Sequence, residues 1–172
     1  LFDLASQNAL AILGRLLHLS GSFLALRPTD NSPHALAAIA RIGRVEVDRY
    51  LRLGAPSIQR AITTAIPVTL HPNHDLLAEV VIPPGQQLVF VPVRSSDRTM
   101  GVLGLLADAS NRDLSDRQLL TILGLTLGVL LENLRQKDDL REMAAIDELT
   151  KVYNRRYFFE HLEREVAFAL RY

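Results

Sequence analysis

The sequence predicts an α+β fold: a central antiparallel sheet flanked by helices, followed by an extended C-terminal helix. Two apolar runs, residues 88–93 and 100–107, are separated by six polar residues. This is the pattern of an antiparallel hairpin, and its continuous apolarity indicates burial on both faces. Helical periodicity precedes this region at residues 8–19 and follows it from Ser115 onward. Central strands with helices at both ends favour helices packed on one sheet.

Composition narrows the classes of protein that this chain can belong to. The 172 residues carry 19 basic and 19 acidic side chains, so the net charge is zero and lacks the basic excess of nucleic-acid binders. The absence of cysteine excludes disulfides, thiolate metal ligands and a thioether-linked chromophore. The most apolar run, residues 119–131, is shorter than the roughly 20 residues of a membrane span. We therefore expect a cytoplasmic chain with no membrane segment and no nucleic-acid partner.

The N-terminal half is predicted as helix, hairpin, irregular segment, helix and edge strand. Residues 8–19 form an amphipathic helix whose apolar face contains Ala9, Ile12, Leu13 and Leu16. Strands are expected at residues 22–26 and 34–44, separated by a polar turn.

Residues 45–53 are predicted to be irregular or a short strand. A short helix is expected over residues 58–65 with Ser57 as its N-cap. Pro67 indicates an edge position for the strand at residues 66–70, because proline cannot donate to a neighbouring strand.

The long C-terminal helix is predicted to begin with a capping box formed by Ser115 and Gln118. Leucines then recur at alternating steps of three and four, the spacing of a coiled-coil seam: Leu120, Leu123, Leu127, Leu130 and Leu134. Two interpretations stay open for residues 119–131: the helix covers its own domain, or it pairs with a second chain. Beyond Asn133 we favour pairing, and hence a homodimer through this helix.

Residues 88–133 resemble the C-terminal half of a GAF domain. The shared features are the strand ending at Pro92-Val93, the strand Gly101-Val102-Leu103, and a capped long helix that ends near Glu132-Asn133. The resemblance covers residues 5–133, more loosely before residue 88. It implies that the ligand cavity of the domain would be lined by Arg41, Tyr50, Ile58, Ala61 and Ile62. These side chains are mostly small and apolar, so the ligand is unknown and its existence stays open.

Residues 147–158 resemble the opening of GGDEF domains, the catalytic module of diguanylate cyclases. The pattern D-x-L-T-x-[LV]-x-N-R-R-x-F is matched here, with Asp147, Thr150, Asn154 and Arg155 among the matched positions. The resemblance implies that the parent protein joins two GTP molecules into cyclic di-GMP with Mg²⁺. The GGDEF motif itself and the associated metal-binding carboxylates are not among the 172 residues, so we expect this piece to have no catalytic residues and no cofactor of its own.

The expected organisation is a GAF sensory domain at residues 1–117, a signalling helix at 118–146, and the truncated start of a GGDEF domain at 147–172. Signal transmission is assigned to Leu123, Leu127, Leu130 and Leu134 of the helix and to the four GGDEF-like residues named above. The alternative is a non-enzymatic GAF dimerisation module attached to a degenerate GGDEF domain or to a phosphodiesterase. A third possibility is a haem- or chromophore-loaded sensor.

The histidines give only weak indications of a metal or haem site. His71, His74 and Asp75 have a spacing that a metal can use, but no third strong ligand lies near them, so a solvated loop is favoured. His18, on the polar face of the first predicted helix, is interpreted as a surface residue rather than a haem ligand. We therefore expect no metal site.

Overall fold

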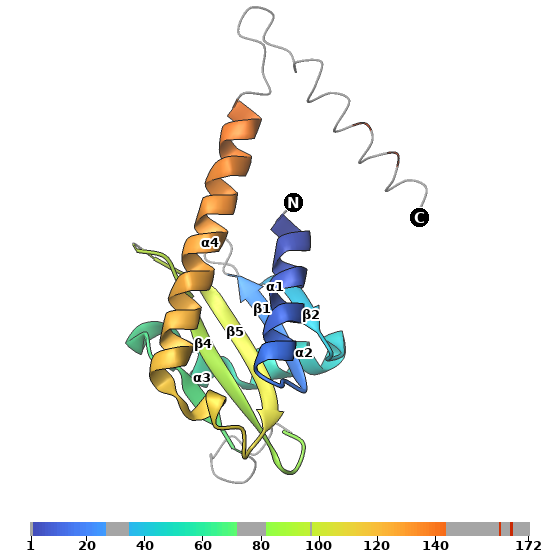
Figure 1. Ribbon diagram of the computed structural model, residues 1–172, viewed down its shortest axis with the longest axis vertical. Coiled ribbons are helices and arrows are strands. Elements are labelled where there is room, and N and C mark those ends of the chain that lie inside the picture. The colour runs from blue at the N-terminus through green and yellow to red at the C-terminus, as the bar shows by residue number, and fades with distance from the viewer. Residues whose placement is uncertain are drawn as a thin grey trace, which may run out of the picture. The chain divides into compact units, whose positions relative to one another are not determined.

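The computed structural model describes residues 2–26, 35–71, 82–96 and 98–143, together with Leu162 and Val166. In this part of the chain, five strands form one antiparallel sheet in the order β2-β1-β5-β4-β3. Figure 1 shows helices on both faces of the sheet, with α1 and α4 on the face nearer the viewer. The predicted α+β architecture is confirmed. The elements in chain order are α1 (Phe2–Leu16), β1 (Gly21–Leu26), β2 (Ala35–Ala40), α2 (Arg44–Leu53), α3 (Ala55–Thr64), β3 (Val68–Leu70), β4 (Gln86–Arg94), β5 (Thr99–Asp108), the 3₁₀ turn η1 (Asp113–Ser115) and α4 (Arg117–Met143).

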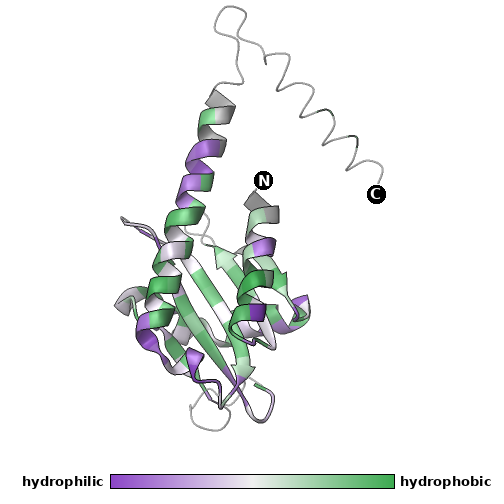
Figure 2. Cartoon of the chain, in the orientation of Figure 1, coloured by the Kyte–Doolittle hydropathy of each residue, from purple (hydrophilic) through white to green (hydrophobic). Residues whose placement is uncertain are grey.

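The two faces of the sheet bury two separate apolar layers. Along β4, Val89 and Val91 belong to the layer that packs against α1 and α4, whereas Leu88 and Phe90 belong to the layer beneath α2 and α3. This alternation follows from the two-residue period of a strand. Figure 2 shows that the central strands are coloured as hydrophobic along most of their length. The continuous apolar runs in the sequence therefore reflect burial on both faces, as predicted.

The strand predictions are confirmed, with shifted ends: the largest shift is in β2, which ends at Ala40 instead of residue 44. β1 pairs with β2 in the predicted N-terminal hairpin, and β4 pairs with β5 from Gln86–Asp108 to Arg94–Thr99. β3 follows Pro67 and lies at the edge of the sheet, as the proline indicated. The central position of β4 and β5 matches their uninterrupted apolar character.

The prediction of an irregular segment or strand at residues 45–53 is wrong, because this segment is the helix α2. The backbone N–H of Gly43 donates to the Glu46 carboxylate at 2.8 Å, and the Val47 N–H donates to the Gly43 carbonyl at 3.1 Å. These bonds start the first turn. Val47 and Tyr50, one turn apart, are then buried on the same face.

Two other helices differ from prediction at their N-termini. α3 begins at Ala55, preceded by Gly54, so Ser57 is a buried residue inside the helix and not its N-cap. α1 begins at Phe2 instead of residue 8, and its buried face is only partly the predicted one: Leu13 of the predicted face packs against the core. Leu10 is fully buried, whereas Ile12 and Leu16 are 53% and 68% exposed. The helix has two apolar faces, and the one containing Leu10 covers the sheet.

The N-cap of α4 is Asp116 and not Ser115. Its Oδ1 atom accepts hydrogen bonds from the backbone N–H groups of Gln118 at 2.9 Å and Leu119 at 3.1 Å. Ser115 is the last residue of η1. The predicted Ser115–Gln118 capping box is therefore wrong, although the prediction was one residue away from the true cap.

We expect Asp116→Ala to lower the free energy of unfolding by about 1 kcal/mol, because two N–H groups of the first turn lose their acceptor. Urea unfolding monitored by circular dichroism would measure this loss. Ser115→Ala is the matched control and should leave stability within about 0.5 kcal/mol of the wild type. Equal losses in both variants would contradict the assignment of the cap.

The chain divides into two compact units, Leu1–Leu131 and Glu132–Tyr172, with the boundary inside α4. The first unit contains the whole sheet and the beginning of α4. The GGDEF-like residues Asp147, Thr150, Asn154 and Arg155 lie outside the described residues, and so do His74 and Asp75 of the histidine loop.

Candidate functional site

Four of the five predicted ligand-binding residues belong to α2 and α3 and lie together where these helices cover the sheet. Tyr50, Ile58 and Ala61 are buried in the apolar layer on this face of the sheet, and Ile62 packs against it. The layer is anchored by Phe23 and Phe90, whose rings meet edge to face with centroids 6.4 Å apart. The structure places these four residues in one layer, and their contact with a ligand stays a prediction.

Arg41 lies apart from the other four. It has a left-handed backbone conformation (φ 59°) just after β2, and its guanidinium group donates to the Leu19 carbonyl at 3.4 Å. There it lines a cavity of about 180 Å³ beside α1. Ser22 lines the same cavity, and its buried hydroxyl group has no hydrogen-bond partner within the part of the chain that the structure describes. The predicted set of five therefore divides between the two faces of the sheet.

Tyr50 is a buried titratable residue in the layer beneath α2 and α3. Its side chain is only 3% exposed, and burial raises the pKa of its phenol above the usual 10.0. The nearby Glu46 carboxylate raises this pKa further, and Arg49 acts in the opposite direction. The folded chain therefore holds the phenolic proton more tightly than the unfolded chain does.

We expect the stability that Tyr50 contributes through this proton to be complete below pH 10 and to be lost as the pH rises through the raised folded-state pKa of Tyr50. Urea unfolding on both sides of this window should show a larger alkaline loss for the wild type than for Tyr50→Phe. If both proteins lose the same stability between the two pH values, Tyr50 does not carry this dependence.

The predicted signalling leucines of α4 do not share one environment. Leu127 is buried, and Leu123 is partly buried against the core beneath α1 and α4. Leu130 is half exposed, and Leu134 is intermediate. At Leu123 and Leu127 the helix thus covers its own domain, which is the first of the two interpretations offered above. Their role in transmitting a signal stays a prediction.

Two glycines bring α4 unusually close to β4. A Cβ atom added at Gly124 would collide with the Pro92 carbonyl, and one added at Gly128 would collide with the Arg94 carbonyl. The two glycines are one helical turn apart, so both face the same strand. Their spacing is visible in the sequence, but the sequence does not show which backbone they approach.

A second apolar face of α4 was missed. Ile122, Leu125 and Val129 are 62%, 42% and 49% exposed. We call these three residues the outer stripe. They recur at helical spacing on the side opposite the buried Leu120, Leu127 and Leu131. The signal was present in the sequence, because the three- and four-residue steps fit this set as well as the leucines chosen.

The described histidines do not gather into a site. His18 is exposed, and its Nδ1 atom lies 3.0 Å from the Arg15 carbonyl oxygen. His71 is exposed at the end of β3. Within residues 2–26, 35–71, 82–96 and 98–143, no group of three or more acidic, histidine or cysteine side chains has a metal-binding arrangement.

One stretch of the described chain, Arg117–Lys137 in α4, is long and apolar enough to cross a membrane by length and composition alone. These criteria are also met by core helices of globular domains. Leu120, Leu127 and Leu131 of this stretch are buried against the sheet. The apolarity of α4 is thus accounted for in part by the core that it covers.

Neither comparison of the sequence with known proteins found a relative: no family model matches, and no curated protein matches. Solved structures do match. The GAF domain of A. aeolicus nlh2 in an inactive state superposes with a TM-score of 0.57 at 18% identity, covering 78% of this chain and 86% of its own. The chain has the GAF fold.

Two further solved structures share the fold. A type II free methionine-R-sulfoxide reductase from Thermoplasma acidophilum gives a TM-score of 0.60 at 13% identity, covering 77% of this chain and 93% of its own. A domain of a putative two-component sensor histidine kinase from Sinorhizobium meliloti 1021 gives 0.55 at 14% identity, covering 81% and 96%. At these identities the GAF fold is what the matches establish. The GAF resemblance expected from residues 88–133 is confirmed at the level of fold.

Proposed function

We propose that this chain is the sensory and dimerisation region of a signalling protein, and that it regulates a diguanylate cyclase module following α4. The observation that carries the proposal is the order of the parts. A GAF fold ends in the long helix α4, and the D-x-L-T-x-[LV]-x-N-R-R-x-F pattern begins at Asp147, four residues after Met143. The sensor histidine kinase match supports a sensory use of this fold.

The proposed signal path is the contact between the sheet and α4. Gly124 and Gly128 hold the helix directly against β4, and Leu120 and Leu127 bury it in the core. A ligand that alters the packing of the sheet would therefore alter the position of α4. It can do so only if it binds one arrangement more tightly than the other.

The proposed partner is a second copy of this chain, and the proposed contact is the outer stripe. Its apolar side chains lie on the solvent side of α4, at a spacing that suits pairing of two helices. Ile12 and Leu16 of α1 add exposed apolar surface on the other helix that covers the same face of the sheet. Two cyclase modules must face each other to join two GTP molecules, as the GGDEF resemblance implies, so a dimer suits this output.

GTP and Mg²⁺ are the substrates and metal proposed for the output module, and a small molecule is the proposed signal for the GAF domain. A cytoplasmic location goes with this proposal. Reduction of a methionine sulfoxide, the activity named for one structural neighbour, is disfavoured because this chain has no cysteine thiol to supply electrons. The alternative output is a degenerate GGDEF domain or a phosphodiesterase, with the GAF domain acting as a dimerisation module alone.

The test uses the natural polypeptide that contains these 172 residues, incubated with GTP and Mg²⁺ and analysed for cyclic di-GMP by chromatography. The 172-residue chain is the blank, and an absorbance spectrum of both proteins checks for a bound haem or other chromophore. Product from the longer protein alone supports the proposal. Bound GTP without product supports the degenerate alternative. If the longer protein forms no product and binds no GTP, the link to this chemistry is overturned.

A further inference from the structure

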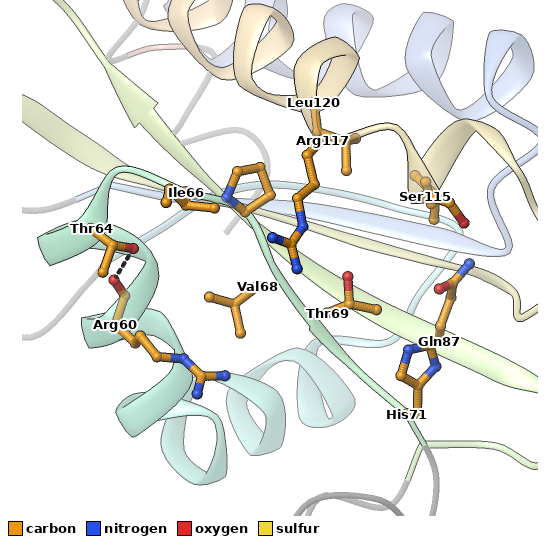
Figure 3. Close-up of a pocket in the computed structure, with 12 residues that line it drawn as sticks. Arg60, Thr64, Ile66, Val68, Thr69, His71, Gln87, Ser115, Arg117 and Leu120 are labelled. Carbon is orange, nitrogen blue, oxygen red and sulfur yellow. Dashed lines mark hydrogen bonds between the residues drawn. The ribbon is translucent and has the colours of Figure 1, made fainter.

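A pocket of about 550 Å³ lies at the β3 edge of the sheet, between the end of α3 and the beginning of α4. Figure 3 shows Arg117 extending from α4 into the space beside Val68 and Thr69, with Arg60 of α3 on another side of the same space. The pocket borders the apolar layer that contains Tyr50, with which it shares Val68, and it has no lining residue in common with the cavity beside Arg41.

Within the described ranges of the chain, the side chains that line this pocket carry a net positive charge. Arg60 and Arg117 line it, and no aspartate or glutamate is among the described residues of the lining. The carboxylate next in sequence, Asp116, is engaged by the N–H groups of Gln118 and Leu119. Neither guanidinium group has a hydrogen-bond or ion-pair partner in the part of the chain that the structure describes.

Polar side chains also line the pocket. Thr69, His71 and Ser115 line the pocket with hydroxyl and imidazole groups that can donate hydrogen bonds. Gln87 forms a rigid part of the wall, since it is only 2% exposed and its amide nitrogen donates to the carbonyls of Asp108 and Asn111 at 3.2 and 3.3 Å. A concave, cationic and donor-rich lining suits an anion better than an apolar ligand.

We propose that this pocket binds a small organic dianion of the phosphate monoester or dicarboxylate class. Guanidinium groups match both chemistries because each presents two parallel N–H donors to a pair of oxygens. The volume falls within the roughly 300–1,000 Å³ range of small-molecule sites, which allows a ligand up to the size of a mononucleotide.

Binding here would connect α3 to the first turn of α4. Arg60 belongs to the last turns of α3 and Arg117 is the first residue of α4, so one ligand that contacts both side chains ties the two helices together. The inference goes beyond the proposed function, because binding can be measured without any output module. Failure of the cyclase assay would leave it standing.

The experiment is isothermal titration calorimetry on the 172-residue chain at about 0.15 M ionic strength, which screens weak surface attraction. Four probes are used: inorganic phosphate, adenosine 5′-monophosphate, the dicarboxylate succinate and neutral adenosine. We expect at least one anion to bind and adenosine not to bind. Preference for the phosphate probes over succinate, or the reverse, assigns the ligand to the phosphate or the dicarboxylate class.

Variants then locate the site. Arg60→Gln and Arg117→Gln should each weaken binding at least about tenfold, because each removes a charged hydrogen-bonding group. Arg117→Lys should recover only part of the loss, since lysine keeps the charge without the paired donors. Arg49→Gln/Arg52→Gln, which removes two exposed arginines of α2 away from the pocket, should bind like the wild type.

Thermal unfolding without ligand keeps the result interpretable, because all variants should melt near the wild-type temperature. No binding of any of the three anions at up to about 1 mM overturns the proposal. Binding that survives Arg60→Gln/Arg117→Gln, or that falls equally in the α2 control, overturns the location. An arginine-dependent affinity supports it.

Discussion

Gly128→Ala is expected to lower the free energy of unfolding by about 2–3 kcal/mol, more than a typical surface substitution. The added methyl group would meet the carbonyl and the backbone nitrogen of Arg94. These are backbone atoms of β4, and Arg94 is paired with Thr99 of β5, so they cannot move aside as a flexible side chain would. The helix must lift from the strand, and Leu127 and Leu131 lose contact with the core.

Gly14→Ala is the matched control, because Gly14 is also a helical glycine but has nothing within 4 Å of an added Cβ. Alanine is the better helix former, so this variant should gain roughly 0.5–1 kcal/mol. Urea unfolding of both variants, followed by circular dichroism, gives the comparison. A Gly128→Ala protein as stable as the wild type would show that α4 does not rest on β4 at this point.

Ile122→Asp/Val129→Asp is expected to convert a dimer into a monomer, with a dimer dissociation constant at least about a hundredfold higher. Both residues belong to the outer stripe, so pairing of two copies would bury two unpaired carboxylates in each chain. Folding should be retained, since the two side chains are exposed in the single chain. Light scattering should give twice the 19.2 kDa chain mass for the wild type and a single chain mass for the variant.

Val45→Asp is the matched control for this experiment. Val45 is an exposed apolar residue of α2, outside the outer stripe, so the same substitution there should leave the dimer intact. Leu127→Lys would not serve, because Leu127 is buried and its replacement would unfold the domain. A monomeric wild type at high concentration would reject the dimer, and a dimeric Ile122→Asp/Val129→Asp protein would reject the outer stripe as its interface.

Residues whose environment follows from local pattern were predicted correctly. β4 and β5 are central strands, and their runs of apolar residues needed no knowledge of the rest of the chain. α2 was missed because Val45 and Val47 alternate with charged residues as in a strand, whereas the helix depends on the Gly43–Glu46 bond and on burial of Tyr50. The cap of α4 was misplaced because serine and aspartate are adjacent and both are good N-caps.

Where a helix has apolar residues on two faces, the sequence alone does not predict which face packs against the sheet. In α4, Leu120 and Leu127 went to the core while Ile122 and Val129 stayed outside, and the two sets have the same spacing. The pocket at the edge of β3 also could not be predicted from the sequence. Arg60 and Arg117 are far apart in the sequence, and only the pairing of β3 with β4 brings α3 near the beginning of α4.

The contact of Gly124 with Pro92 and of Gly128 with Arg94 also fixes the register between helix and strand. Four helical residues advance about 6 Å and two strand residues about 6.6 Å, so the two repeats nearly coincide. Sliding α4 by one turn would put Leu120 over the Pro92 carbonyl in one direction or Glu132 over the Arg94 carbonyl in the other. Both shifts place a large side chain where only a hydrogen atom fits. The first turns of α4 therefore cannot act as a piston, and any displacement of this helix must carry β4 with it or pivot about the two glycines.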